Sequence, residues 1–272
     1  MARATAPTED LNSVDLIDTE RYPIADPQSP AFARVVEAAR QSYDAEGLAL
    51  LPGFLKADAR RQMITEAEAA IPRSHRRDIS FGIYRDESLD RPPEGHPALR
   101  KNPFSQWVIA ADLLPEHGAL RSLFRAEPMV AFVGALVGET LYCSADPLAA
   151  CNVTVMREGD QHGWHFDAND FVVSLLLEKS SGGGQFEVRP GTRTESGIDH
   201  DAVAAAFSGT DGKIRRPPVE EGTLSIFRGQ RSLHRVSPVS GGRRMIALFS
   251  YDRRPGMLFS DQVRLGAFGR AS

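Results

Sequence analysis

A short stretch of the chain, GWHFDANDF at residues 163–171, places two side chains that can bind a metal close together. His165 and Asp167 stand two positions apart, and in a β-strand such positions project to the same face. Phe166 lies between them and is expected to point the opposite way, into packing. The pair by itself is equally typical of a core histidine beside a turn aspartate, so the metal hypothesis depends on a further ligand.

A second histidine, His234, supplies that ligand in the segment SIFRGQRSLHRVSPV, between two apolar stretches with the composition of strands. Two histidines and one carboxylate form the facial triad of non-haem Fe(II) oxygenases, which leaves coordination positions open for oxygen and a co-substrate. The same ligands also suit zinc, so a metal hydrolase is one alternative. The chain has no HExxH motif, however, and its ligands lie on predicted strands. A cupin-like binding protein without turnover is the other alternative.

An arginine follows the second histidine at the start of the apolar segment RRMIALFSYD. A planar guanidinium binds a carboxylate through two parallel hydrogen bonds, as the distal carboxylate of 2-oxoglutarate requires. Alternation along a strand directs only one of Arg243 and Arg244 inward, and Arg244 is the preferred candidate. Asn152 and Thr154 share one face of the predicted strand CNVTVM, so we expect them to contact the co-substrate, unless this is an outward polar face.

The elements that must position these residues fall into two groups. Helical periodicity covers residues 31–47 and 56–70, on either side of a short buried strand in LALLPGF, and further helix is expected between Leu120 and Val137 with an interruption near Pro128. From Leu141 onward, short β-branched and aromatic runs alternate with Gly, Pro, Asp and Ser. Helices followed by strands predict an α+β fold, namely a double-stranded β-helix (a jelly-roll or cupin-like barrel) with supporting N-terminal helices.

This pattern predicts one oxygenase domain over residues 31–272, after an irregular lead-in at 1–30. Helical support and a lid extend to about residue 140, the jelly-roll core covers about 141–256, and a C-terminal tail covers 257–272. Residues 73–105, rich in Arg, Pro, Gly and Asp, are predicted to be a long irregular segment that provides the lid.

Several of these segments carry a family resemblance. HFD, GGGQFEV, GTLSIFRGQRSLHRVSPVSGGRR and ALFSYDRRPG, in that order, resemble the Fe(II)/2-oxoglutarate-dependent oxygenase superfamily. The wording of GDQHGWHFDANDFVVSLLLE and RSLHRVSPV more closely resembles a narrower group, the hydroxylases and radical halogenases that act on free amino acids. The resemblance implies Fe(II) as cofactor, with 2-oxoglutarate and O2 as co-substrates and succinate and CO2 as products.

One position separates the two activities of that group. The halogenases carry a glycine where this chain has Asp167, and the missing carboxylate leaves a place for a halide. Asp167 therefore predicts a hydroxylase that acts on an unactivated C–H bond of a small molecule, a free amino acid or a derivative by resemblance. Desaturation, cyclisation or halogenation on the same scaffold are the alternatives. Ala168 departs from the acidic substrate contact expected in the amino-acid halogenases, which leaves the substrate open.

Candidate substrate contacts are spread over the chain. His162 lies three residues before His165, at a position where the similar group has a histidine that contacts the substrate. Asp146 is a candidate partner for a substrate ammonium, although an aspartate before proline is typical of a turn. The remaining candidates are Arg76, with its neighbour Arg77, as carboxylate clamps in the predicted lid, and Ser250 and Asp252, which share a predicted strand face with Arg244.

Composition limits the partners. The chain has 272 residues, 42% of them hydrophobic, which is enough for a sizeable core. A formal net charge of −4 favours neither nucleic acid nor an anionic membrane surface as a partner. Two cysteines, Cys143 and Cys151, make no disulfide framework, and no stretch approaches the roughly 18 apolar residues of a membrane span. These features predict a cytoplasmic enzyme with a small-molecule substrate.

Overall fold

The structure is a computed structural model that describes residues 13–84, 91–167 and 169–272. Ala168 and part of the predicted lid therefore lie outside the described residues, as does the start of the lead-in. The lead-in from residue 13 is more ordered than predicted. Leu16, Ile17 and Ile24 are buried in the main core, because the segment contains apolar residues between its polar ones.

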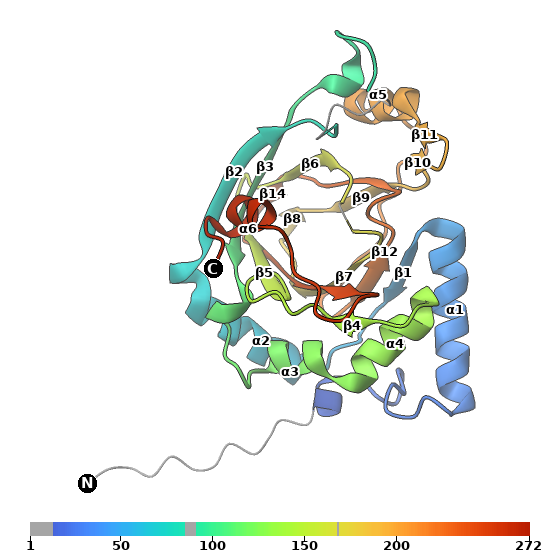
Figure 1. The fold of residues 1–272 in the computed structure, drawn as a ribbon, viewed down its shortest axis with the longest axis vertical. Helices are drawn as coiled ribbons and strands as arrows, with labels where there is room; N and C mark the ends of the chain where they lie inside the picture. Colours follow the sequence, from blue (N-terminus) through green and yellow to red (C-terminus); the bar gives the residue numbers. More distant parts are fainter. Residues whose placement is uncertain (1–12, 85–90, 168) are drawn as a thin grey trace.

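A curled antiparallel sheet forms the centre of the molecule (Figure 1). The strand order is β1-β12-β7-β15-β5-β3-β6-β13-β9, and β2 pairs with β3 outside this order. The strands span Leu48–Leu51 (β1), His75–Phe81 (β2), Asn102–Ile109 (β3), Cys151–Met156 (β5), His162–His165 (β6), Val172–Glu178 (β7), Phe186–Arg189 (β9), Leu224–Phe227 (β12), Leu233–Val236 (β13) and Arg244–Phe249 (β15). This arrangement confirms the predicted jelly-roll architecture.

Two-residue strands and short 3-10 turns complete the chain. The small strands are β4 (Tyr142–Cys143), β8 (Gly182–Gly183), β10 (Arg193–Thr194), β11 (Gly197–Ile198), β14 (Val239–Ser240) and β16 (Tyr251–Asp252). The 3-10 turns are η1 (Ser13–Leu16), η2 (Ile71–Arg73), η3 (Pro97–Leu99) and η4 (Ala111–Leu113). β16 continues the direction of β15 and pairs with β4, so the segment after the long strand stays attached to the barrel.

The two faces of the sheet differ in chemistry because side chains alternate along each strand. Val153 and Val155 of β5 belong to the main hydrophobic core, together with Met245 and Ala247 of β15. The residues between them, including Asn152 and Thr154, project to the opposite, inner face. Since directly paired residues of antiparallel strands share a face, Ile246 and Leu248 lie on that inner face too, opposite Thr154 and Asn152.

Helices cover the outer face of the sheet (Figure 1). They span Pro30–Glu46 (α1), Ala57–Ala70 (α2), Ala119–Arg125 (α3), Glu127–Val137 (α4), His200–Ser208 (α5) and Asp261–Phe268 (α6). α1 begins where Ser29 accepts a hydrogen bond from the Phe32 amide and ends at Gly47, whose φ of 70° lies in the left-handed region that glycine tolerates. Helices α1 to α4 pack their apolar sides on the strands, whereas α5 lies at the far end of the barrel (Figure 1).

The predicted helices and their interruption are confirmed, whereas the prediction of a long irregular segment was wrong. The break falls at Ala126, and Pro128 lies in the first turn of α4, where its missing N–H costs little. Residues 73–105 are not irregular throughout, because they contain β2 and the start of β3. The C-terminal tail forms α6, and its Phe268 packs with Val108 and Leu148. No described helix is long and apolar enough to cross a membrane.

Candidate metal centre and co-substrate site

The two candidate histidine ligands face each other across neighbouring strands. His165 closes β6, and its partner in the β6–β13 register is His234. Directly opposed residues of an antiparallel pair project to the same side, and the two imidazole centroids lie 4.1 Å apart. Both rings are buried, with exposed fractions of 6% and 3%. The sheet register therefore brings together two residues from distant parts of the sequence.

Each imidazole has one nitrogen fixed by its own backbone. Nδ1 of His165 lies 2.8 Å from the carbonyl oxygen of Gly163, and Nδ1 of His234 lies 2.9 Å from that of Ser232. A carbonyl only accepts, so Nδ1 must carry the proton and Nε2 of the neutral ring presents its lone pair. This arrangement is the usual way in which a second hydrogen bond orients a metal-binding histidine.

Asp167 completes the cluster from the loop after β6. Its backbone N–H donates to the carbonyl oxygen of Gly229 at 3.1 Å, which holds the loop against the β12–β13 connection. Oδ1 lies 3.5 Å from Nε2 of His165, and Oδ2 lies 3.1 Å from Nε2 of His234. One ligand atom from each of the three residues lies within 4.8 Å of the others, and no other such cluster occurs in the described ranges.

The electrostatics of the three groups suit a cation. Burial lowers the pKa of His165, and the neighbouring His234 lowers it further, so the ring is neutral at physiological pH. Burial works to raise the pKa of Asp167, but the two imidazoles outweigh it and hold that pKa well below its usual value. Oδ2 of Asp167 is buried and has no hydrogen bond from any described residue. Nε2 of His234 lies 3.1 Å from this oxygen, so a metal ion would take the place between the imidazole and the carboxylate.

Arg244 is a buried cation on the inner face of the sheet. Its exposed fraction is 5%, and none of the described residues forms a hydrogen bond or ion pair with its guanidinium. Burial lowers its pKa from 12.5 to about 10. Arg243 points the other way and pairs with Glu68 of α2 and Glu178 of β7. The alternation expected for these two arginines is therefore observed, with Arg244 inward.

Asn152 and Thr154 lie on the same inner face as Arg244. The sheet register pairs Arg244 with Met156, so Thr154 stands one inward position further along β5 and Asn152 one beyond that. Both side chains are buried. The Asn152 amide donates to the Ala149 carbonyl, while the Thr154 hydroxyl has no partner within the described part of the chain.

His162 is brought to the site and Arg76 is not. The His162 ring stacks on Phe104 at 4.0 Å and its Nε2 contacts the amide oxygen of Gln106. Arg76 pairs with Trp107 in the register and binds Asp160, whereas Arg77 pairs with Gln106 and lies 4.6 Å over the Phe104 ring. Strand alternation thus puts Arg77, and not Arg76, on the face that carries His162.

The other substrate candidates have different surroundings. Both carboxylate oxygens of Asp146 are engaged, by the backbone N–H groups of Leu148, Ala149 and Phe259 and by the nearby Arg264. Its turn role is therefore the one observed. Ser250 donates to the Ala149 carbonyl from the bend between β15 and β16. Asp252 accepts from Arg254.

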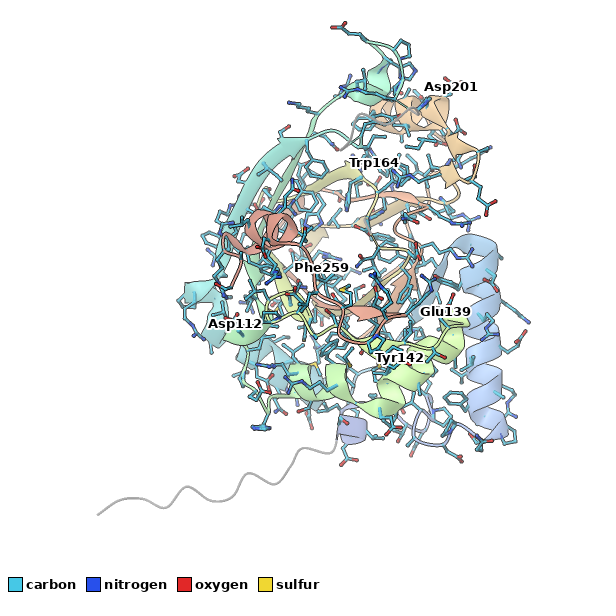
Figure 2. The ribbon with its side chains drawn as sticks, viewed as in Figure 1. Asp112, Glu139, Tyr142, Trp164, Asp201 and Phe259 are labelled. Atoms are coloured by element: carbon cyan, nitrogen blue, oxygen red, sulfur yellow. The ribbon has the colours of Figure 1, made fainter. Side chains whose placement is uncertain are left out.

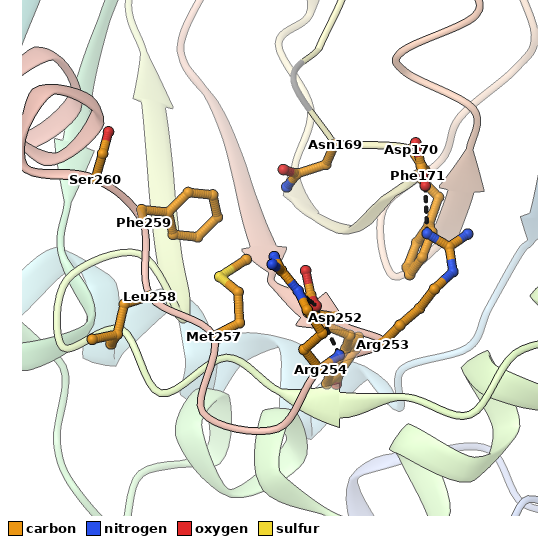
Figure 3. A pocket seen from close by; sticks show the side chains of 11 residues that line it. Asn169, Asp170, Phe171, Asp252, Arg253, Arg254, Met257, Leu258, Phe259 and Ser260 are labelled. Carbon is orange, nitrogen blue, oxygen red and sulfur yellow. Dashed lines mark hydrogen bonds and ion pairs between the residues drawn. The ribbon is translucent and has the colours of Figure 1, made fainter.

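Asp252 also lines a cavity near the C-terminal end of the chain (Figure 3). The cavity has a volume of about 510 Å³ and lies between the loop at Asn169–Phe171 and the C-terminal segment. Figure 3 shows Met257 and Phe259 on one side and the Asp170–Arg253 ion pair on the other. Asn169, which lines the cavity, follows Asp167 by two residues in the sequence, whereas the three ligand candidates themselves do not line it.

Several residues of the site were missed at the level of sequence. Phe104 and Gln106 of β3 contact His162, and β3 begins inside the segment 73–105 that was predicted to be irregular. Trp164, labelled in Figure 2, belongs to a second hydrophobic cluster together with Phe166 and with Val203 of α5. α5 itself was not predicted.

Comparison with known proteins gives the family. The chain has the fold of an oxidoreductase of the 2OG-Fe(II) oxygenase family from Burkholderia pseudomallei, with 16% identity and a TM-score of 0.54 over 81% of this chain and 92% of that one. The chain is also similar to AviO1 from Streptomyces viridochromogenes Tue57, with 20% identity and a TM-score of 0.55 over 81% of this chain and 96% of that one. A third similar structure is a prolyl-4-hydroxylase from Pseudomonas putida, with 16% identity and a TM-score of 0.51 over 79% of this chain and 97% of that one. No curated protein matches the sequence.

These likenesses confirm the predicted oxygenase fold. The family model described as Halogenase D matches residues 32–257, which include all three candidate metal ligands and Arg244. The chain therefore belongs to the Halogenase D family, on the scaffold of the Fe(II)/2-oxoglutarate oxygenases.

Proposed function

We propose that the protein is an Fe(II)- and 2-oxoglutarate-dependent hydroxylase of a small molecule. The observation that carries the proposal is the combination of His165, Asp167 and His234 around one point with a buried, unpaired Arg244 on the same inner face. Bound iron and 2-oxoglutarate supply the oxidising chemistry that splits O2 and attacks a C–H bond. The chain's own residues would bind the metal and 2-oxoglutarate, orient the substrate and shield the site from water.

In this proposal His165 and His234 bind the metal through Nε2, and Asp167 binds it through a carboxylate oxygen. The backbone hydrogen bonds of both Nδ1 atoms fix the rings before metal arrives, so little ordering cost remains on binding. The ionised Asp167 offsets one of the two metal charges. Three ligands on one side leave the other side for the co-substrate and O2.

Arg244 would hold the distal carboxylate of 2-oxoglutarate. A buried guanidinium without a partner favours a bidentate anion, because the ion pair restores the solvation that burial removed. The hydroxyl of Thr154 and the amide of Asn152 stand along the same face, between Arg244 and the end of β5, and are suited to hydrogen-bond the co-substrate. Because these side chains are buried, each of these contacts would be stronger than at an exposed site.

Asp167 supports hydroxylation over halogenation, although the family takes its name from a halogenase. A halide would need the coordination position that the carboxylate takes. With Asp167 as a ligand, that position would be closed to a halide, so oxygen would be transferred to the substrate instead. Desaturation and cyclisation would share the same ligands, and the pose of the substrate decides among them.

The substrate would enter through the cavity beside Asn169 and reach the face that carries His162 and Arg77. The cavity wall is mixed, with apolar Met257 and Phe259 and charged Asp252 and Arg254. This lining suits a small molecule that carries both charge and apolar surface, and a free amino acid or a derivative is the first candidate.

Anaerobic titration of the protein with Fe(II) and then 2-oxoglutarate tests the proposal. We expect the weak visible charge-transfer band of a chelated iron–keto acid complex in the natural protein and in the surface variant R243M. The band should be absent from H234A. A screen of amino acids and related metabolites for succinate formation would then identify the substrate. Tight zinc together with no response to 2-oxoglutarate would favour a metal hydrolase instead.

A further inference from the structure

A glycine on the β12–β13 connection lies directly against the Asp167 carboxylate. A Cβ atom built on Gly229 would fall 2.1 Å from Oδ2 of Asp167 and 2.9 Å from its Cβ and Cγ. Real Cβ atoms essentially never approach so closely, so any side chain at position 229 would require the carboxylate to move. The carbonyl of the same glycine accepts the Asp167 backbone N–H, which prevents the loop from simply drawing back.

The backbone conformation of Gly229 does not itself require glycine. Fifteen glycines have a positive φ, and Gly229 is not among them. The φ angle of Gly229 therefore does not exclude alanine, whereas the contact with Asp167 does. The atom that would be struck, Oδ2, is the one that lies 3.1 Å from Nε2 of His234. Displacing it would separate the carboxylate from the two imidazoles.

From this contact we propose that Gly229 is a positioning residue that admits a carboxylate as the third metal ligand. It acts through Asp167, so the inference rests on the proposed function. Positions 167 and 229 are then coupled: a carboxylate at 167 requires the absence of a side chain at 229. A chain with a side chain at 229 would have a two-histidine site, whatever residue stood at 167, and would leave that coordination position to an external ligand.

A double-mutant cycle tests the coupling, using G229A, D167A and D167A/G229A. Affinity for Co(II) is measured by anaerobic calorimetry in chloride-free buffer, because a halide would otherwise occupy the vacated position. We expect G229A to weaken Co(II) binding about 10- to 100-fold, the range seen when a partner of a metal ligand is removed. In the D167A background the same substitution should change affinity less than about twofold, since no carboxylate remains to be struck.

The visible spectrum of bound Co(II) separates positioning from a general structural effect. The spectrum of G229A should match that of D167A, because both sites lack the carboxylate, and differ from that of the natural protein. G212A is the matched control, since Gly212 also lacks a positive φ and a Cβ there would meet nothing within 4 Å. It should retain the natural affinity and spectrum.

Each result has a definite reading. Equal losses from G229A with and without Asp167, or natural affinity in G229A, would overturn the inference while leaving the metal site in place. If G229A does not fold, D167A/G229A should still fold like D167A, and its failure to do so would also overturn the inference. Absence of Co(II) and Fe(II) binding by the natural protein would instead refute the proposed function, and this inference with it.

Discussion

Replacing Arg244 with methionine should stabilise the ligand-free protein while abolishing its response to 2-oxoglutarate. Burial lowers the Arg244 pKa from 12.5 to about 10, and no described residue offers a counter-charge. At 1.36 kcal/mol for each pKa unit, holding the charged guanidinium in the fold costs about 3 kcal/mol. Methionine has a similar length and no charge, so R244M removes that cost and keeps most of the apolar packing.

The sign of the pH dependence follows from the lowered pKa. Below pH 10 the guanidinium is protonated in both the folded and the unfolded chain, so the full cost acts against folding. The cost declines only as the pH rises from about 10 towards 12.5, where the folded protein releases its proton first. At neutral pH the gain from R244M is therefore at its maximum and independent of pH.

Thermal denaturation with and without ligand measures both effects. A net gain of about 2 kcal/mol would raise the melting temperature of ligand-free R244M by roughly 4–8 °C in a chain of this size. With Mn(II) in place of Fe(II), 2-oxoglutarate at about 100 times its dissociation constant should stabilise the natural protein by about 2.7 kcal/mol. It should leave R244M unchanged.

Arg243 provides the matched control. R243M removes an arginine next in sequence whose side chain is 28% exposed and paired with Glu68 and Glu178. Pairs of this kind contribute about 0–1 kcal/mol, so its stability should fall slightly and its response to 2-oxoglutarate should remain. A marked loss of stability in R244M, or equal stabilisation of R244M by 2-oxoglutarate, would refute the reasoning.

Three further outcomes are expected. H165A and H234A should each lose bound Fe(II) after desalting, measured by metal analysis, while H200A, on α5 outside the cluster, should retain it. D146A should lower the free energy of unfolding by about 3 kcal/mol and expose the tail to protease. The reason is that the buried Asp146 carboxylate accepts three backbone N–H groups and lies 3.5 Å from Arg264. Unchanged proteolysis of D146A would contradict this. Burial raises the pKa of the Cys151 thiol, so it stays neutral and should resist iodoacetamide at pH 8 until the protein is unfolded, as mass spectrometry would reveal.

The sequence was most informative where one strand pattern and one chemical pattern coincided. The three metal ligand candidates and the inward Arg244 could be recognised because their spacing, their residue types and the flanking apolar strands all agreed. The same rule of alternation gave the opposite directions of Arg243 and Arg244. The alternation rule could not be applied to Arg76 and Arg77, because the strand that contains them was not recognised. Its sequence is rich in arginine and is followed by prolines, which is typical of irregular segments.

Features that depend on contacts between distant segments could not be predicted. The register that opposes His165 and His234 is decided by pairing across the whole barrel. Asp146 looked available for a substrate in the sequence, yet the tail donates the Phe259 N–H to it. Gly229 carries no local signal at all, since its role depends on a carboxylate from another loop.

Arg244 is a buried charge, and Asp167 carries the opposite charge on a side chain that is 24% exposed but whose Oδ2 is buried. No ion pair joins the two residues in the described part of the chain. Apolar residues at both positions would give a more stable barrel, because each buried charge loses hydration that no protein group restores. A metal cation beside Asp167 and an organic dianion that reaches Arg244 would restore it for both at once. The two charges therefore make the ligand-free barrel less stable than the loaded one, and a single co-substrate that chelates the metal and pairs with the guanidinium satisfies both.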